Sequence, residues 1–120
     1  MKIRLPEAIA SFSAALAVIL GAMAAHALHD SLEAANRLDA YETAAFYHLT
    51  HSIGAFILAR AGLLKCAWTI LAGVLLFSGS LYLLCLVEGT SFLGPVTPIG
   101  GLIMIVAWGA AGIARLRDKG

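Results

Sequence analysis

The stretch Tyr47-His48-Leu49-Thr50-His51 places one tyrosine and two histidines inside a run that is otherwise apolar enough to cross a lipid bilayer. A polar side chain in hydrocarbon is costly unless it finds a hydrogen-bonding partner or faces water. Such residues therefore mark a candidate functional site. The rest of the chain can be interpreted as the frame that holds this stretch at its depth.

The composition of the chain predicts a membrane protein. Of its 120 residues, 61% are hydrophobic and 12% are charged, and the charged share is about half that of a typical soluble domain. Four membrane spans of about 20 residues each would fill two thirds of the chain. We therefore expect a single membrane domain over residues 1–120. The net charge of +1 and the lack of a long Lys/Arg run give no indication of a nucleic-acid partner.

Four apolar segments have the length of a membrane span, at about 7–28, 42–61, 66–87 and 98–114. The first has a basic start like that of a signal peptide, but its apolar run exceeds the usual 7–15 residues, so we expect a retained helix. The second and third are joined by a very short turn and must be antiparallel neighbours. The pattern predicts an all-α protein, an antiparallel four-helix transmembrane bundle.

The first span carries a stripe of small residues at spacings of three and four. This spacing puts them on one helix face, where another helix can approach closely. The stripe is formed by Ala10, Ala14, Ala17, Gly21 and Ala24.

The basic residues predict how the chain is oriented in the membrane. Cytoplasmic loops and ends carry an excess of Lys and Arg. In the four-span scheme Arg37 alone falls on the other side, so both termini are predicted to be cytoplasmic. The residues on the cytoplasmic side are Lys2, Arg4, Arg60, Lys65, Arg115, Arg117 and Lys119, and the acidic residues facing outward are Asp30, Glu33, Asp39, Glu42 and Glu88.

Two pairs of histidines are expected at similar depth in the outer half of the membrane. His48 and His51 share one face of the second span with Tyr47, and His26 and His29 lie at the outer end of the first. Imidazole suits zinc, copper and iron, so these four histidines are candidate metal or haem ligands. Two alternatives stay open: the imidazoles hydrogen-bond neighbouring helices and hold them together, or they handle protons or a small solute.

The third span contains the hydroxyl-rich string Phe77-Ser78-Gly79-Ser80-Leu81-Tyr82. Helix packing and interhelical hydrogen bonds account for these residues most simply. A serine nucleophile would need a base and an orienting acid at the same depth, and the spans offer no such acid. We therefore assign no catalytic residue and no cofactor, and expect a protein that is not an enzyme.

Several strings together resemble a known family. They are Gly21-Ala22-Met23-Ala24-Ala25-His26-Ala27-Leu28, the stretch from Tyr47 to His51, Leu76-Phe77-Ser78-Gly79-Ser80-Leu81-Tyr82, Thr97-Pro98-Ile99-Gly100-Gly101, and Trp108-Gly109. In this order they resemble the YgdD-like family, the domain of unknown function 423, which is related to eukaryotic transmembrane protein 256. The resemblance covers nearly the whole chain. It implies a small four-helix, multi-pass protein of the bacterial inner membrane, without an established activity.

The resemblance also marks individual positions. Those that match the family pattern are His26, Tyr47, His51, Ser78, Gly79, Ser80, Tyr82, Thr97, Pro98, Gly100 and Gly101. His48 departs from it, because the family pattern carries glutamine there. An amide is a poor substitute for a metal-binding imidazole, so the resemblance argues against a four-histidine metal site and favours a polar cluster around His26 and His51.

We therefore predict a polar site in the outer half of the membrane that binds or passes a small polar ligand, a lipid headgroup or protons. Its candidate residues are His26, Tyr47, His48, His51, Ser78, Ser80 and Tyr82. One alternative is an accessory subunit whose small-residue stripes pack against a partner membrane protein or a second copy of the chain. Another is a metal or haem protein that uses the four histidines. In every case the lipid bilayer is the expected surrounding.

Overall fold

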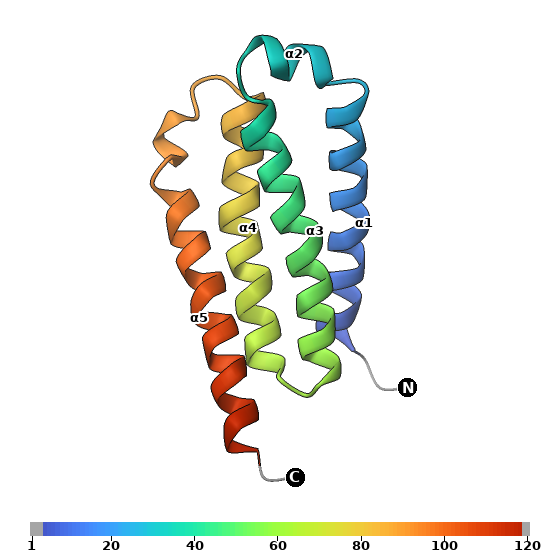
Figure 1. Ribbon diagram of the computed structural model, residues 1–120, viewed down its shortest axis with the longest axis vertical. Coiled ribbons are helices and arrows are strands. Elements are labelled where there is room, and N and C mark those ends of the chain that lie inside the picture. Colours follow the sequence, from blue (N-terminus) through green and yellow to red (C-terminus); the bar gives the residue numbers. More distant parts are fainter. Residues whose placement is uncertain (1–3, 119–120) are drawn as a thin grey trace.

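The computed structural model describes residues 4–118, and every regular element in that range is a helix (Figure 1). The long helices lie within four residues of the four apolar ranges expected from the sequence. The elements are α1 (Leu5–Ala25), α2 (His29–Ala34), α3 (Leu38–Arg60), α4 (Leu64–Leu86), the 3-10 helix η1 (Ser91–Leu93) and α5 (Val96–Arg117).

Three segments are long and apolar enough to cross a membrane: α1, α4 and the 27 residues of Ser91–Arg117 that include α5. Helix α3 has a similar length, 23 residues, but more polar side chains reduce its hydropathy. These are Asp39, Glu42, Thr43, His48, Thr50, His51 and Ser52. The polar groups of α3 therefore need partners on neighbouring helices.

The four long helices pack in the order α1, α3, α4, α5, and neighbours run in opposite directions (Figure 1). Helix α3 lies between α1 and α4, and α5 packs on the far side of α4. Helices α1 and α4 touch only over a small area. Between them they leave a groove that reaches His48 of α3.

The small-residue stripe of α1 faces α3, as the sequence predicts. Ala10, Ala17 and Ala24 are at most 3% exposed. A Cβ atom built on Gly21 would lie 3.8 Å from the Cβ atom of Ala45 in α3, so the two backbones approach closely. The prediction that this stripe packs against another helix is confirmed.

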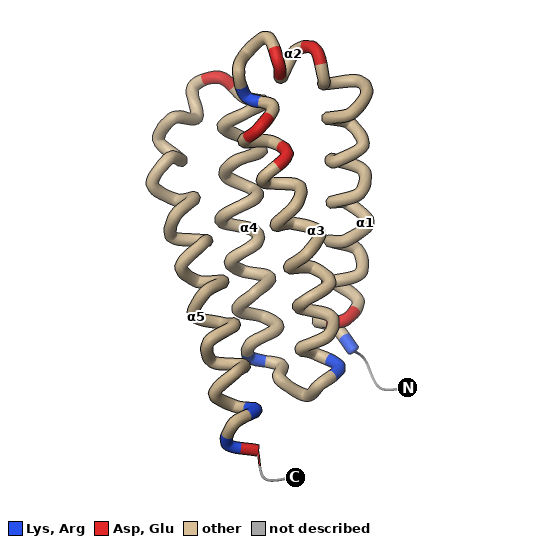
Figure 2. The backbone as a smooth tube through the Cα atoms, in the orientation of Figure 1, with Lys and Arg blue, Asp and Glu red and all other residues tan. Residues whose placement is uncertain are grey.

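Charged residues gather at the two ends of the helices (Figure 2). The end that carries the first and last described residues holds the basic residues Arg4, Arg60, Lys65, Arg115 and Arg117, while Arg37 lies at the opposite end, beside α2. Lys2 and Lys119 lie outside the described residues. Glu7 and Asp118 at the basic end form ion pairs with Arg4 (3.8 Å) and Arg115 (3.6 Å).

Two helix boundaries differ from the sequence-based prediction and move the histidines. Helix α1 ends at Ala25, so His26 caps it and His29 opens α2. Helix α3 begins at Leu38 rather than near residue 42. At 1.5 Å per residue, His48 and His51 then lie about 15 and about 20 Å from the start of α3, close to its middle and not near the end that adjoins α2.

Candidate functional site

His48 is the buried centre of a polar cluster that joins three helices. His48 is only 5% exposed. The ring nitrogen Nδ1 lies 2.9 Å from Tyr82 Oη of α4, and Nε2 lies 3.1 Å from Ser13 Oγ of α1. Ser13 Oγ lies in turn 2.7 Å from Ser52 Oγ, one turn further along α3 from His48. We call these four residues the His48 cluster.

The hydrogen bonds of the His48 cluster have one consistent direction when the imidazole is neutral. Ser52 donates to the carbonyl oxygen of His48 at 2.6 Å, and a carbonyl oxygen can only accept. Ser13 must then donate to Ser52, and His48 Nε2–H to Ser13. The other ring nitrogen, Nδ1, is left to accept the hydrogen of Tyr82. Every polar hydrogen of the cluster is thus used within the protein.

Neutral imidazole is also the form that the surroundings of His48 favour. An isolated charge in an apolar interior is costly unless an opposite charge accompanies it. No ion pair of His48 is found within residues 4–118, and its two ring nitrogens meet only hydroxyl groups. The arrangement therefore holds a single tautomer, with the hydrogen on Nε2.

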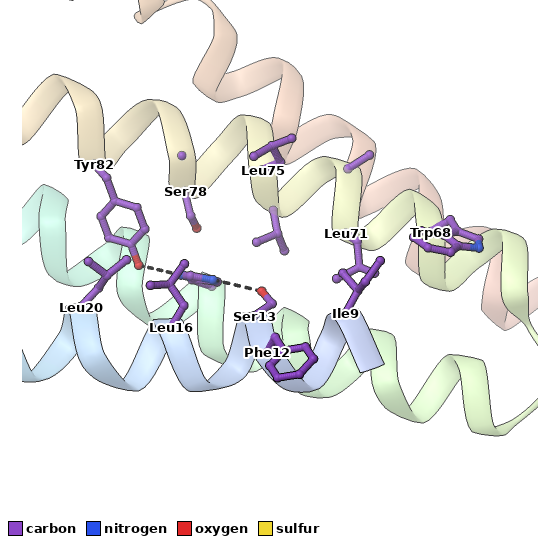
Figure 3. A pocket seen from close by; sticks show the side chains of 14 residues that line it. Ile9, Phe12, Ser13, Leu16, Leu20, Trp68, Leu71, Leu75, Ser78 and Tyr82 are labelled. Atoms are coloured by element: carbon purple, nitrogen blue, oxygen red, sulfur yellow. Dashed lines mark hydrogen bonds between the residues drawn. The ribbon is translucent and has the colours of Figure 1, made fainter. Parts of the chain in front are cut away.

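Three members of the His48 cluster, Ser13, His48 and Tyr82, line the floor of an open groove of about 640 Å³ between α1 and α4 (Figure 3). The walls are apolar. Trp68 contributes an indole N–H at one end of the lining, and four other lining residues carry polar groups. These four are Ser13, His48, Ser78 and Tyr82, and the apolar residues include Ile9, Phe12, Leu16, Leu20, Leu71 and Leu75. A volume of this size lies in the range of small-molecule sites.

Ser78 lines the same groove but does not bond to His48. It is 1% exposed, and its hydroxyl donates to the carbonyl oxygen of Ala44 in α3 at 2.8 Å. Tyr41, which is fully buried, lies beside Tyr82 with ring centroids 5.2 Å apart and donates to the carbonyl oxygen of Leu20. These contacts fix α3 against α1 and α4 around the cluster.

His51 and Tyr47 lie on another side of α3, with the Tyr47 ring against Phe77 of α4 at 5.0 Å and His51 toward α5. Their rings stack with centroids 5.4 Å apart, and the His51 ring meets Trp108 of α5 at 6.0 Å. His51 Nδ1–H donates to the carbonyl oxygen of Tyr47 at 3.1 Å and also lies 3.1 Å from Thr50 Oγ1. The structure therefore separates Tyr47 and His51 from the His48 cluster, although all three residues share one helix.

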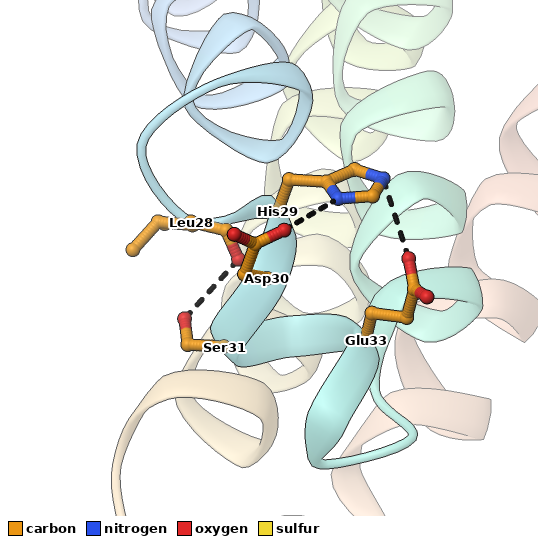
Figure 4. Close-up of polar contacts among 5 residues, drawn as sticks. All are labelled: Leu28, His29, Asp30, Ser31 and Glu33. Carbon is orange, nitrogen blue, oxygen red and sulfur yellow. Dashed lines mark hydrogen bonds and ion pairs between the residues drawn. The ribbon is translucent and has the colours of Figure 1, made fainter.

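His26 and His29 lie at the end of the molecule that carries α2 and are remote from the His48 cluster. His26 is exposed, and its imidazole makes no hydrogen bond to the described residues. His29 is placed between Asp30 Oδ1 (3.4 Å) and Glu33 Oε2 (3.5 Å) (Figure 4). The expectation that four histidines converge is therefore wrong. Within residues 4–118, no group of three or more His, Cys, Asp or Glu side chains is arranged to hold a metal ion.

Ser80 also points away from the histidines. Its hydroxyl lies 2.5 Å from Thr97 Oγ1, so it joins α4 to α5. The residues expected from the sequence as one cluster thus occupy several places. Of them, the structure joins the side chains of His48 and Tyr82 by a hydrogen bond, with Ser78 in the same groove. It brings His51 against Tyr47 as a separate pair.

Sequence analysis missed Ser13 and Ser52, which complete the His48 cluster. Both are hydroxyl residues near the middle of long helices, and Ser52 follows His48 at a spacing of four, which puts them on one helix face. A polar group inside a membrane span needs a partner, and by this rule Ser13 is a candidate site residue. Its partner depends on how α1 is rotated against α3.

Comparison with known proteins supports the membrane assignment. The chain is 36% identical to the UPF0382 membrane protein YwdK of Bacillus subtilis over 106 residues, which are 82% of this chain and 85% of that protein. It is 34% identical to a UPF0382 membrane protein of Staphylococcus epidermidis over 92% of this chain and 93% of the relative. A UPF0382 membrane protein of Schizosaccharomyces pombe is 36% identical over 83% of this chain and 92% of its own length.

No solved structure matches the chain significantly. A family model described as "Protein of unknown function (DUF423)" matches residues 20–101, which include His48, Ser52, Ser78 and Tyr82. This match and the relatives above confirm the resemblance drawn from the sequence. The chain is a membrane protein that belongs to the DUF423 family.

Proposed function

We propose that this protein is a four-helix, multi-pass protein of the bacterial inner membrane that binds a lipid chain in the groove between α1 and α4. The observation that carries the proposal is the His48 cluster at the floor of an otherwise apolar, open groove. Apolar walls suit a hydrocarbon chain. A few fixed polar groups suit recognition of one polar point on that chain.

The proposed topology rests on the distribution of charge and on packing. Both described ends of the chain lie at the basic end, which corresponds to the cytoplasmic side by the excess of Lys and Arg there. Helix α3 is the least apolar of the four, yet its buried polar side chains find partners on α1 and α4. A helix with its polar groups satisfied in this way is compatible with hydrocarbon on its remaining faces.

The groove differs from ordinary lipid-facing surface in its polar floor. Helix–helix contacts in membranes use hydroxyl and imidazole groups to hold helices together, and the His48 cluster does this. Ser13, Ser78 and Tyr82 nevertheless also line the open space. An adjacent polar group of a bound molecule can therefore reach them, which a purely structural cluster would not require.

The proposal is tested by photolabelling the purified protein in liposomes with a diazirine-bearing hydrocarbon amphiphile and mapping the labelled peptides. We expect labelling to concentrate on residues of α1 and α4 that line the groove. Ala72→Trp, which fills the groove, should abolish this concentration. Ala110→Trp is the matched control, because Ala110 is equally an exposed alanine but lies on α5 outside the groove. Even labelling of all lipid-facing surfaces, unchanged by Ala72→Trp, would contradict the proposal.

A further inference from the structure

Three hydroxyl groups line the groove, and the protein itself uses the hydrogen of each. Ser78 donates to the carbonyl oxygen of Ala44, Tyr82 to His48 Nδ1, and Ser13 to Ser52 Oγ. The fourth polar lining group, His48, uses its Nε2–H on Ser13 and its Nδ1 lone pair on Tyr82. At the His48 cluster and Ser78, the polar atoms that remain toward the groove are oxygen lone pairs, and these only accept hydrogen bonds. The one further polar atom of the lining is the indole N–H of Trp68, a donor that lies ten residues along α4 from Ser78, or about 15 Å at 1.5 Å per residue.

From this we infer that the groove selects an uncharged amphiphile that carries a hydroxyl group, a long-chain or lipid alcohol, because the free polar atoms beside His48 and Ser78 are all acceptors. The inference rests on the proposed function, the binding of a lipid chain in the same groove. An alcohol supplies the hydrogen that Tyr82, Ser13 or Ser78 can accept. An ester, ether or ketone offers only further lone pairs, so it would form a hydrogen bond with these groups only if Tyr82 gave up its hydrogen bond to His48, and it is expected to bind more weakly.

The charge of the lining residues points to the same class of ligand. The groove is lined by no Lys, Arg, Asp or Glu side chain among the described residues. A carboxylate or phosphate at this depth would lack a cation, and an ammonium group would lack an anion. An uncompensated charge is costly in an apolar site. A neutral hydroxyl therefore fits both the direction of the hydrogen bonds and the absence of charge.

The test compares two photolabels, a diazirine-bearing hexadecanol and its methyl ether, at equal low concentration in liposomes. The alcohol can donate a hydrogen bond and the ether cannot. We expect the alcohol to label the groove about threefold to tenfold more than the ether, the factor that one such hydrogen bond supplies. Equal labelling of the groove by both would overturn the inference and leave the proposed function standing. Absence of groove labelling by either compound would overturn the proposed function, and the inference with it.

A substitution that exposes a donor provides the second arm. Ser13→Ala removes the acceptor of His48 Nε2–H, so a free donor faces the groove and the ratio of alcohol to ether labelling should fall toward one. Ser11→Ala is the control, because Ser11 bonds the carbonyl oxygen of Glu7 in its own helix and is exposed. An unchanged ratio in folded Ser13→Ala would count against the inference. If that variant does not fold, the comparison in the native protein decides alone.

Discussion

Gly100 of α5 lies directly against the backbone of Gly73 in α4. A Cβ atom at position 100 would be 2.9 Å from the carbonyl oxygen of Gly73 and 2.9 Å from the carbonyl carbon of Leu76, while a Cβ atom at position 73 would be 3.1 Å from the carbonyl oxygen of Gly100. At Gly100 the nearest atoms of α4 are all backbone atoms, while Gly73 also lies beneath the side chain of Met104 in α5, whose Cγ would be 2.6 Å from a Cβ atom at position 73. Lipid tails are as apolar as the side chains between helices, so burial of apolar surface does not drive membrane helices together. Close backbone approach provides the van der Waals contact that does.

Gly100→Ala should therefore destabilise the protein, by roughly 1–3 kcal/mol as for overpacking of a close-packed interior. The added methyl group meets backbone atoms, which cannot rotate away. Gly109→Ala is the control, because a Cβ atom there would have no neighbour within 4 Å. Unfolding followed by circular dichroism in detergent micelles measures both variants. Equal stability of Gly100→Ala and Gly109→Ala would show that α4 and α5 are not in this close contact.

The positions of the long helices could be predicted because the length and composition of apolar runs determine them. The face of α1 that packs on α3 could be predicted as well, because Ala10, Ala17 and Ala24 repeat at helical spacing. The start of α3 could not. Its first turn contains Asp39 and resembles a loop in composition, yet Tyr41 in the second turn is fully buried beside α1.

The partners of the histidines also could not be predicted. His48 and His51 lie only 60° apart around α3, and sequence reasoning placed them in one cluster. Because α3 is packed between other helices, this angle is enough to direct His48 toward Ser13 and Tyr82 and His51 toward Trp108. The rotation of each helix about its axis depends on the packing of all four, which spacing within a single helix does not reveal.

His48→Leu is expected to destabilise the protein more than His48→Gln. Leucine leaves the Tyr82 hydroxyl without its acceptor and removes the donor to Ser13, which keeps its hydrogen bond to Ser52. An unsatisfied buried polar group costs about 1–3 kcal/mol. Glutamine offers one donor group and one acceptor and can restore part of the cluster. Thermal unfolding in detergent compares the two, with His26→Leu as the control at an exposed position whose side chain forms no hydrogen bond or ion pair in the described range. His48→Leu as stable as the native protein would refute the hydrogen-bonded cluster.

Ser80 and Thr97 should be energetically coupled, since their hydroxyl oxygens lie 2.5 Å apart between α4 and α5. A double-mutant cycle with Ser80→Ala and Thr97→Val is expected to give a coupling of about 0.6 kcal/mol, and at most about 1.7, as for hydrogen bonds between membrane helices. The same cycle with Ser80→Ala and Thr69→Val is the control, because Thr69 bonds the carbonyl oxygen of Lys65 in its own helix. A cycle for Ser80 and Thr97 that closes to zero would exclude the contact.

Whether α3 crosses the membrane can be decided from the two residues that flank it. Ala34 ends α2 before α3, and Ala61 follows the last residue of α3, and both are exposed. With Cys66→Ala and Cys85→Ala removing the native thiols, we expect Ala34→Cys to react with a membrane-impermeant maleimide in intact cells. Ala61→Cys should react only after the membrane is opened. Hydropathy alone does not identify α3 as a membrane span. The contrast between the two cysteines therefore tests whether α3, packed between α1 and α4, spans the membrane. Reaction of both cysteines from outside would place both ends of α3 on one side and exclude the four-span topology.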